Sequence, residues 1–252
     1  MKISVITATF NSAATVGSCM ASVASQDWGD IEHVIVDGGS TDDTLDVVNN
    51  AERAPDQLVS EPDKGIYDAL NKGIAMATGD VVGFLHSDDV FADEAVLSRI
   101  ADAFERESVD AVYGDLQYVR AADLDAVIRH WTAGEFSRKK LQWGWMPPHP
   151  TLYVRREWYE QIGGFDLNYS IAADYHSMLK LFGNPEFRAA YISSVLVKMR
   201  VGGASNRSLT NIVRKSREDL RAMRETGVGA LGGYGALAWK NVSKVGQFLK
   251  RK

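Results

Sequence analysis

The first 110 residues alternate between short apolar runs and stretches whose apolar residues lie three or four positions apart. The short runs predict four buried β-strands, at Lys2–Thr7, Ile31–Val36, Leu58–Val59 and Val81–Leu85. The helical spacing predicts helices between them, at Ala13–Ser25, Thr41–Asn50 and Ile66–Ala77. Thr41 is expected to cap the second helix and Gly79 to end the third. Strands and helices in this order are typical of an α/β fold with a doubly wound, mostly parallel sheet.

The pattern becomes irregular after residue 110. Only two strand-like pieces stand out, at Ala111–Tyr113 and Val127–Trp131, and an aromatic and proline-rich loop follows at Gln142–Pro150. Helical spacing returns near the end of the sequence, at Leu209–Glu225 and Ala236–Leu249. We therefore expect an irregular second half, followed by C-terminal helices. A substrate other than the one bound by the first half would bind there.

Charge separates the end of the sequence from the rest. Residues 207–252 hold eleven Lys and Arg and three acidic residues, a balance of +8, whereas the whole chain carries −5. We predict a domain at 1–206 with two halves, 1–110 and 111–206, and a basic tail at 207–252. An amphipathic basic tail favours an anionic membrane surface. The alternative is a tail packed on its own body or on a second subunit, so an oligomer stays open.

Composition narrows the class of protein. The 252 residues are 45% hydrophobic and 24% charged, which is ordinary for a globular domain. No apolar run reaches the roughly 18–20 residues that span a bilayer, and no basic segment followed by an apolar stretch opens the sequence. Cys19 is the single cysteine and has no partner for a disulfide. The sequence contains no recognised nucleic-acid module. We expect a cytoplasmic protein, peripheral on the inner face of the membrane.

A polar cluster follows each of the four predicted strands. The clusters are Thr7–Asn11, Asp37–Asp42, Glu61–Gly65 and His86–Asp89. Each one alone has the composition of a turn. However, the carboxyl ends of parallel strands share one edge of the sheet, and ligands bind in the crevice there. Carboxylates such as Asp88 and Asp89 suit Mg²⁺ or Mn²⁺ carrying a diphosphate. The clusters together predict a nucleotide site.

The ordered series of motifs resembles a known family. It comprises Thr-Ala-Thr-Phe-Asn at 7–11, Val-Asp-Gly-Gly-Ser-Thr-Asp at 36–42, Glu-Pro-Asp-Lys-Gly-Ile-Tyr-Asp-Ala-Leu-Asn-Lys-Gly at 61–73, Ala-Thr-Gly-Asp at 77–80, and a double aspartate at 88–89. Together these motifs resemble a family 2 glycosyltransferase of the GT-A fold, over residues 1–205. The resemblance implies that 1–110 is the nucleotide-sugar-binding half and 111–206 the acceptor half. They are most similar to bacterial enzymes that assemble exopolysaccharide or O-antigen repeat units on a lipid carrier. The resemblance implies metal-dependent transfer of a hexose or N-acetylhexosamine, with inversion, from a nucleoside diphosphate sugar, usually a UDP-sugar.

The resemblance also implies which residues bind the donor and the metal. The expected donor-binding residues are Thr7, Phe10, Asn11, Asp37, Ser40, Asp63, Lys64, Asp68, Asn71, His86, Ser87 and Arg200. Asp37 would accept a hydrogen bond from the uracil ring, and Arg200 would contact the diphosphate. The expected metal ligands are Asp88, Asp89 and His149; an acceptor-loop role for His149 is the alternative. His86 replaces the first aspartate of the family's Asp-x-Asp motif.

Asp174 is the expected catalytic base. Gly163-Gly164-Phe165-Asp166 and then Ala173-Asp174 resemble the family's Gly-Gly-Phe-Asp and Glu-Asp motifs, with Ala173 in place of the glutamate. Inverting transfer is a single displacement, which needs a carboxylate at the acceptor hydroxyl and a metal at the departing diphosphate. The alternative is that Asp174 only caps an amphipathic helix.

Two other functions remain open at this point. A nucleotidyltransferase also uses carboxylate-bound metal, but it typically needs a glycine-rich, basic loop after its first strand, and Thr7–Asn11 has neither glycine nor base. A non-catalytic sugar-nucleotide-binding or scaffold protein is consistent with Ala173 and His86, although Asp37, Asp88 and Asp174 together argue against it.

Overall fold

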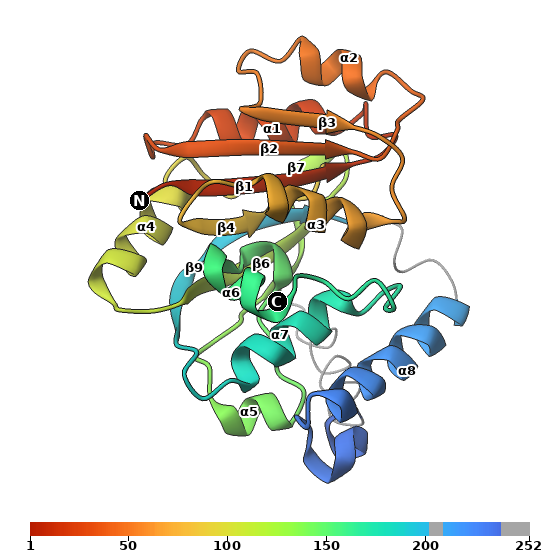
Figure 1. Cartoon of the computed structure of the whole chain (residues 1–252). Helices are drawn as coiled ribbons and strands as arrows, with labels where there is room; N and C mark the ends of the chain where they lie inside the picture. The colour runs from red at the N-terminus through yellow and green to blue at the C-terminus, as the bar shows by residue number, and fades with distance from the viewer. Residues whose placement is uncertain (202–208, 238–252) are drawn as a thin grey trace.

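In a computed structural model of the chain, which describes residues 1–201 and 209–237, a nine-stranded mixed sheet carries helices on both faces (Figure 1). The strands are β1 (Ile3–Thr9), β2 (Ile31–Asp37), β3 (Gln57–Ser60), β4 (Val81–Phe84), β5 (Asp89–Phe91), β6 (Ala111–Arg120), β7 (Asp123–Trp131), β8 (Tyr153–Arg155) and β9 (Ala189–Arg200). The helices are α1 (Val16–Ala24), α2 (Thr44–Asn49), α3 (Ile66–Met76), α4 (Val96–Arg106), α5 (Arg138–Gln142), α6 (Arg156–Ile162), α7 (Ala173–Gly183) and α8 (Leu209–Glu225), with short 3₁₀ helices η1 (His149–Thr151) and η3 (Ala230–Gly233).

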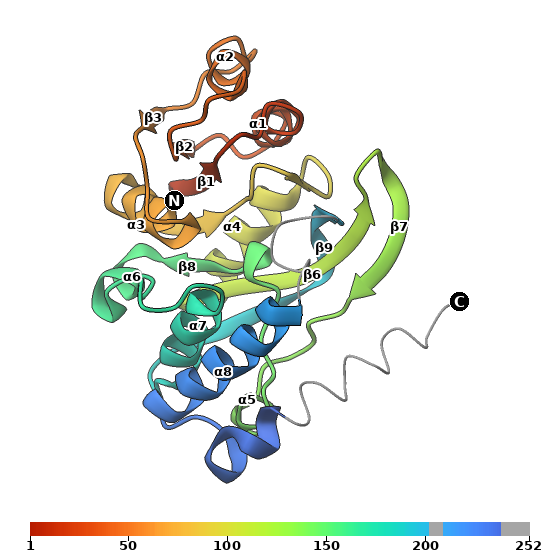
Figure 2. The same ribbon diagram turned by 90° about the vertical axis from the view of Figure 1, so that its right-hand side faces the viewer.

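The four strands predicted from the sequence form one parallel block in the order β3-β2-β1-β4. Strand residues alternate between the two faces. In β1, Ile3 and Val5 pack with α1 and α4, whereas Ile6 packs with α3. Figure 2 shows α1 and α3 on opposite sides of this part of the sheet. The α/β, doubly wound architecture expected from the sequence is therefore present in this half.

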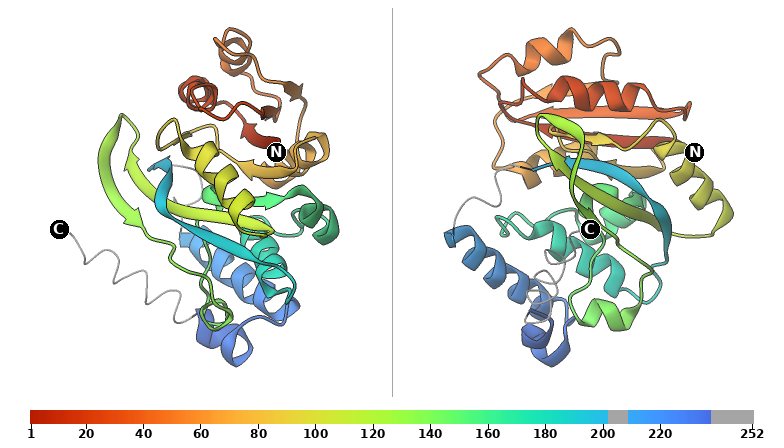
Figure 3. Two further views of the ribbon diagram at one scale, coloured as in Figure 1. Left: turned by 90° about the vertical axis from the view of Figure 1, so that its left-hand side faces the viewer. Right: turned by 180° about the vertical axis from the view of Figure 1, so that it is seen from behind.

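The second half of the sheet is more regular than the sequence indicated. β8 runs antiparallel to β4, and β6, β9 and β5 follow, with β7 paired to β6 at the outer edge (Figure 3). The predicted pieces Ala111–Tyr113 and Val127–Trp131 lie in β6 and β7 but were too short, since these strands have ten and nine residues, and the twelve-residue β9 was not predicted. β7 is half exposed along its length, and β9 carries Ser193, Ser194 and Lys198 among its apolar residues. Neither strand therefore shows the uninterrupted apolar run from which a strand is predicted.

Two predicted helix boundaries need correction. α2 begins at Thr44 rather than after Thr41, because the Asp42 carboxylate accepts the backbone N–H of Thr44 (3.0 Å) while Asn11 accepts that of Thr41 (2.9 Å). α3 ends at Met76, before Gly79. Gly79 instead lies against β1, where a Cβ atom would come within 2.5 Å of Ser4 Oγ.

Helices α7 and α8 lie side by side on the face of the sheet that α3 covers (Figures 1 and 2). α7 is not the amphipathic helix that was expected, because most of its side chains are buried between the sheet and its neighbouring helices. α8 has the predicted bounds, and its Ala222 and Met223 belong to the main hydrophobic core. The second predicted tail helix, Ala236–Leu249, falls mostly outside the described residues. No helix in the described part of the chain is long and apolar enough to cross a membrane.

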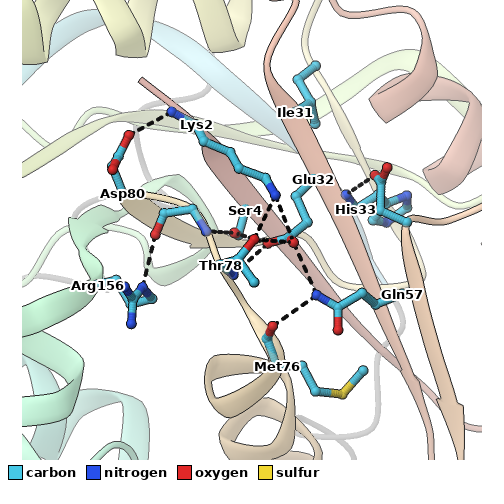
Figure 4. A network of polar contacts seen from close by, with 12 residues as sticks. Lys2, Ser4, Ile31, Glu32, His33, Gln57, Met76, Thr78, Asp80 and Arg156 are labelled. Carbon is cyan, nitrogen blue, oxygen red and sulfur yellow. Dashed lines mark hydrogen bonds and ion pairs between the residues drawn. The ribbon is translucent and has the colours of Figure 1, made fainter.

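A buried carboxylate organises the edge of the sheet opposite the carboxyl ends of β1 and β2 (Figure 4). Glu32 is 3% exposed and accepts hydrogen bonds from Lys2 Nζ (3.0 Å), Ser4 Oγ (2.5 Å), and the backbone and side chain of Thr78 (2.8 and 2.6 Å). Burial alone would raise the pKa of Glu32, but these hydrogen bonds lower it to about 2. The network ties β1 and β2 to the Ala-Thr-Gly-Asp motif before β4.

Candidate active site

The polar loops after the parallel strands meet at one edge of the sheet, as expected. The backbone N–H of Asn11 donates to Ser40 Oγ (2.8 Å), and Asn11 holds a left-handed backbone conformation (φ +48°) while its side chain accepts from Thr41. Ser87 Oγ, after β4, lies 3.0 Å from Ser12 Oγ. These contacts join the loops after β1, β2 and β4 into one polar surface.

Phe10, Gly38 and Asp63 form the part of this surface best suited to a planar base. Phe10 is 60% exposed although it follows a fully buried strand. A Cβ atom on Gly38 would lie 3.4 Å from the Phe10 ring and would overlap the Asp63 carboxylate. An exposed aromatic ring, bare backbone and a half-buried carboxylate therefore lie together, which allows stacking on a nucleobase and acceptance of its N–H.

Thr7 and Asp37 do not lie where the sequence resemblance placed them. Thr7 is fully buried, and its hydroxyl contacts His33 Nε2 (3.0 Å) on the face that α1 covers. Asp37 is also fully buried: its carboxylate accepts hydrogen bonds from the backbone of Gly39 and Ser40 and from the hydroxyls of Ser40 and Ser60. Thr7 therefore does not line an open pocket, and Asp37 shapes its loop instead of facing a ligand.

Asn71 also has a different role from the expected donor contact. Its side-chain amide donates to the carbonyl of Phe165 (2.8 Å) and accepts from the backbone N–H of the same residue (2.8 Å). A Cβ atom on Gly164 would overlap the Asn71 amide oxygen. Asn71 thus fixes α3 to the Gly-Gly-Phe-Asp loop. By contrast, Lys64 is exposed, and Asp68 accepts the Lys64 backbone N–H (3.1 Å) at the start of α3.

Arg200, at the end of β9, anchors the double-aspartate turn. Its guanidinium donates to the Asp88 carbonyl (2.5 Å) and to Ser18 Oγ (2.9 Å), and its backbone N–H donates to Asp89 Oδ1 (3.2 Å). Asp88 is half buried, and no hydrogen bond or ion pair from the described residues engages its carboxylate. Arg200 therefore lies beside Asp88, and its contact with a diphosphate stays a prediction.

Asp89 points into the protein rather than toward the site. It is fully buried, and its second carboxylate oxygen has no partner among the described residues. Burial, helped by the neighbouring charge of Asp88, raises its pKa well above the usual range. This placement does not support the expected role of Asp89 as a metal ligand, because the carboxylate is closed off from the surface.

Two histidines and Asp174 complete the site. The His149 ring stacks on Phe84 (centroids 5.2 Å apart) and lies 6.1 Å from the His86 ring. Burial lowers the pKa of both histidines, to about 4 for His149, against the opposing charge of Asp174. The charge of Asp88 also opposes the lowering of the pKa of His86. Both imidazoles are therefore neutral at pH 7, and each has a buried ring nitrogen without a hydrogen-bond partner in the described part of the molecule.

Asp174 lies in the first turn of α7 but does not cap the helix. The N-cap is Ala172, and no side chain caps it. Asp174 Oδ1 instead accepts a hydrogen bond from the Tyr67 hydroxyl (3.2 Å), which reaches it from α3. Sequence reasoning missed Tyr67, although it stands inside the Gly-Ile-Tyr-Asp part of a recognised motif, because nothing in the motif shows which residue its hydroxyl contacts.

The residues of the site suit a divalent metal only if phosphate oxygens of a substrate supply further ligands to it. Within residues 1–201 and 209–237, no group of three or more His, Cys, Asp or Glu side chains could hold a metal ion. Mg²⁺, however, is usually bound through one or two carboxylates together with substrate phosphates. The Asp88 carboxylate, unengaged by the described residues, meets that requirement.

Comparison with known proteins identifies the class of enzyme. Residues 4–163 match the family model described as glycosyl transferase family 2. The chain belongs to this family and is a glycosyltransferase. A PGL/p-HBAD biosynthesis glycosyltransferase of Mycobacterium bovis (strain BCG / Pasteur 1173P2) is 36% identical over 209 residues, covering 81% of this chain and 78% of the relative. The assignment decides against a nucleotidyltransferase or a non-catalytic scaffold.

Solved structures show the same fold. Staphylococcus aureus TarS 1-349 superimposes with a TM-score of 0.69 at 23% identity, over 90% of this chain and 65% of that one. Mannosyltransferase PcManGT from Pyrobaculum calidifontis, in complex with GDP-Man and Mn²⁺, gives a TM-score of 0.65 at 19% identity, over 100% of this chain and 76% of that one. The GT-A fold expected from the sequence is confirmed.

Proposed function

We propose that this glycosyltransferase moves a hexose or N-acetylhexosamine from a UDP-sugar to a lipid-linked saccharide, with inversion and with a divalent metal. One observation carries the proposal: ring contacts run from Tyr67, which holds Asp174, through Phe165 (5.6 Å) and His149 (5.7 Å) to His86 (6.1 Å), two residues before Asp88. A carboxylate suited to a metal–diphosphate and a carboxylate suited to an acceptor hydroxyl therefore belong to the two ends of one aromatic row at the sheet edge. A single displacement requires these two groups on either side of the anomeric carbon.

Asp88 would hold the metal together with oxygens of the donor diphosphate. Bound there, Mg²⁺ or Mn²⁺ would stabilise the negative charge that develops on the departing diphosphate. Arg200 keeps the turn that carries Asp88 in place through the Asp88 carbonyl. The buried His149 ring stacks on Phe84 and meets Phe165 edge-on, so we assign His149 to the aromatic wall beside the Gly-Gly-Phe-Asp loop rather than to the metal.

Asp174 would accept the proton of the acceptor hydroxyl. Its carboxylate is half buried and is oriented by one hydroxyl donor, Tyr67. His86 and His149 are neutral near pH 7, so they leave the negative charge of Asp174 without a neighbouring imidazolium partner.

Further observations support the donor and the acceptor classes. TarS has been solved with UDP and with UDP-GlcNAc, and the surface formed by Phe10, Gly38 and Asp63 suits a nucleobase. The mycobacterial relative is named for PGL/p-HBAD biosynthesis. The +8 balance of residues 207–252 favours an anionic membrane surface. We therefore place the enzyme in polysaccharide or glycolipid assembly, at the cytoplasmic face of the membrane.

A nucleotide-release assay tests the proposal. UDP-glucose, UDP-galactose, UDP-N-acetylglucosamine and GDP-mannose would be incubated with the enzyme and a bacterial membrane lipid extract, with Mg²⁺ or Mn²⁺ and with EDTA. We expect release of UDP from one UDP-sugar, and its loss in EDTA and in Asp88→Asn. Full activity in EDTA would contradict the metal dependence, and release from GDP-mannose alone would contradict the donor.

A further inference from the structure

The segment immediately before Asp174 is held by a side chain from α8. The Glu218 carboxylate accepts three consecutive backbone N–H groups, from Ser170 (3.2 Å), Ile171 (2.8 Å) and Ala172 (3.0 Å). Ala172 is the N-cap of α7, so Glu218 supplies the acceptor that no side chain of α7 provides. Charge-assisted hydrogen bonds of this kind are roughly twice as strong as neutral ones.

The same segment is held from the opposite direction by α3. The Tyr67 hydroxyl lies 2.6 Å from the carbonyl of Ile171 and 3.2 Å from Asp174 Oδ1. The single Tyr67 O–H hydrogen is shared between these two acceptors, the nearer being the carbonyl, so Ile171 is held through its N–H by Glu218 and through its C=O by Tyr67. Burial, together with the charges of Asp174 and Glu218, raises the pKa of Tyr67, so its hydroxyl stays protonated as a donor.

A second carboxylate of α8, that of Glu225, binds the side chain of Tyr169, the residue immediately before this segment. Glu225, seven residues after Glu218 and thus on the same helix face, accepts the Tyr169 hydroxyl (2.7 Å) and Arg221 Nε (2.7 Å). The side chain of Ala222, between the two glutamates, is fully buried in the core. The inner face of α8 thus presents two carboxylates to residues 169–172, and only Glu218 binds the backbone.

We propose that Glu218 is a positioning residue for catalysis: α8 fixes the 170–172 backbone so that the Asp174 carboxylate meets both the Tyr67 hydroxyl and the acceptor. This inference rests on the proposed role of Asp174 as the base. It gives α8 a function inside the active site, distinct from any contact with a membrane. Misplacing a reacting group by about 1 Å can cost about 100-fold in rate.

Glu218→Gln is the first test, with Glu225→Gln as its matched control. Glutamine keeps one acceptor oxygen, which cannot serve three N–H groups, and its amide N–H₂ would face donors. In Glu225→Gln the remaining oxygen still accepts the single Tyr169 hydroxyl. With the preferred UDP-sugar and membrane lipid extract, we expect Glu218→Gln to lower kcat about 10- to 100-fold. The KM for the UDP-sugar should stay within about twofold, because the donor pocket is built from other loops. Glu225→Gln should keep wild-type kcat.

Tyr67→Phe is the second test, and it does not depend on Glu218→Gln folding well. Loss of the hydroxyl removes a donor that stabilises the ionised Asp174 carboxylate, so the acid limb of the kcat–pH profile should move to higher pH. If both residues act on the same segment, the double variant should lose less activity than the product of the two single losses.

Parallel measurement of Asp174→Asn separates this inference from the proposed function. Wild-type kcat in Glu218→Gln, or equal losses in Glu218→Gln and Glu225→Gln, would overturn the positioning role while Asp174→Asn remains inactive. An unchanged pH profile in Tyr67→Phe together with strictly multiplicative losses in the double variant would overturn it as well. Retained turnover in Asp174→Asn would instead overturn the base assignment on which the inference depends.

Discussion

Gly38 is the residue at which the donor pocket depends most directly on the absence of a side chain. A Cβ atom there would overlap the Asp63 carboxylate and touch the Phe10 ring. The two side chains that face a nucleobase in our proposal therefore come together only because residue 38 has no side chain of its own.

Gly38→Ala should raise the KM for the UDP-sugar at least about tenfold, because the new Cβ atom overlaps the Asp63 carboxylate, which must move aside and so lose its position beside the Phe10 ring for binding the base. Gly29→Ala is the matched control, since nothing lies within 4 Å of a Cβ atom at that position. Initial-rate kinetics on both variants check the expectation. Equal KM values in the two variants would contradict this location of the pocket.

Asn71→Ala should destabilise the fold and leave the KM for the donor nearly unchanged. The substitution leaves the backbone N–H and C=O of Phe165 without their partners, and an unsatisfied buried group costs about 1–3 kcal/mol. Urea unfolding monitored by circular dichroism measures the loss. A raised donor KM at unchanged stability would restore the donor-binding role that the sequence resemblance indicated.

Single residues show where prediction from sequence succeeds and where it stops. The alternation of strands and helices correctly predicted a parallel sheet, so the loops after β1 and β4 were expected at one edge, where Ser87 Oγ meets Ser12 Oγ. The motifs do not determine the direction of a side chain within a strand or loop. The side chain of Thr7 lies on the face of β1 that α1 covers. The Asp37 carboxylate accepts hydrogen bonds from neighbouring backbone N–H groups and hydroxyls. These are tertiary contacts, which residue type alone does not reveal.

At the scale of elements, the Glu32 network connects the parallel strands at the end away from the active site (Figure 4). It joins β1 and β2 to the segment that leads into β4, so it sets the relative position of the strands whose loops build the site. The Ala-Thr-Gly-Asp motif, recognisable in the sequence, has its physical explanation here. Thr78 satisfies Glu32, and Gly79 permits close approach to β1.

The depressed pKa of Glu32 predicts a pH-dependent stability. The folded-state pKa is about 2 and the ordinary value is 4.5, so the contribution is fully present above about pH 4.5 and is lost as pH falls toward 2. The shift corresponds to about 3 kcal/mol. Wild type should therefore lose more unfolding free energy than Glu32→Gln between pH 5 and pH 2.5, as measured by urea unfolding. Parallel losses in the two proteins would contradict the network's role.

The strands of the first half were predicted from the sequence more completely than those of the second half, for a physical reason. β1, β2 and β4 of the parallel block are buried on both faces, whereas β7 is half exposed and β9 mixes polar and apolar residues. The pairing of β9 with β6 and β5 joins segments far apart in sequence. This long-range pairing brings Arg200 to Asp88, and no local sequence pattern predicts it.

At the scale of the whole molecule, the basic end of the sequence has two parts with different surroundings. The described part of α8 packs on α7 and contributes Ala222 and Met223 to the core, so for α8 the structure favours the packed alternative. The last five basic residues of the chain, Lys240, Lys244, Lys250, Arg251 and Lys252, lie outside the described residues. The proposed membrane contact rests on these five charges and on Trp239.

A chain ending at Leu237 should lose binding to vesicles of anionic phospholipid and keep its thermal midpoint. Each basic residue near an anionic surface contributes about 1 kcal/mol, so removal of five should weaken binding at least about tenfold at low salt. Vesicle co-sedimentation at low salt and near 0.15 M salt measures this, since screening weakens exposed charges. Equal binding of the two chains, or no binding of the intact chain, would contradict the membrane contact.

The central claim is that Asp174 removes the proton from the acceptor hydroxyl. Asp174→Asn keeps the size of the side chain and an oxygen for Tyr67, but it cannot accept a proton at neutral pH. The direct measurement is kcat for transfer to membrane lipid extract beside the Kd for UDP from calorimetry. We expect kcat to fall by about 10²- to 10⁴-fold with the Kd for UDP unchanged. A wild-type kcat in this variant, or a collapse of UDP affinity with turnover of bound donor preserved, would contradict the account.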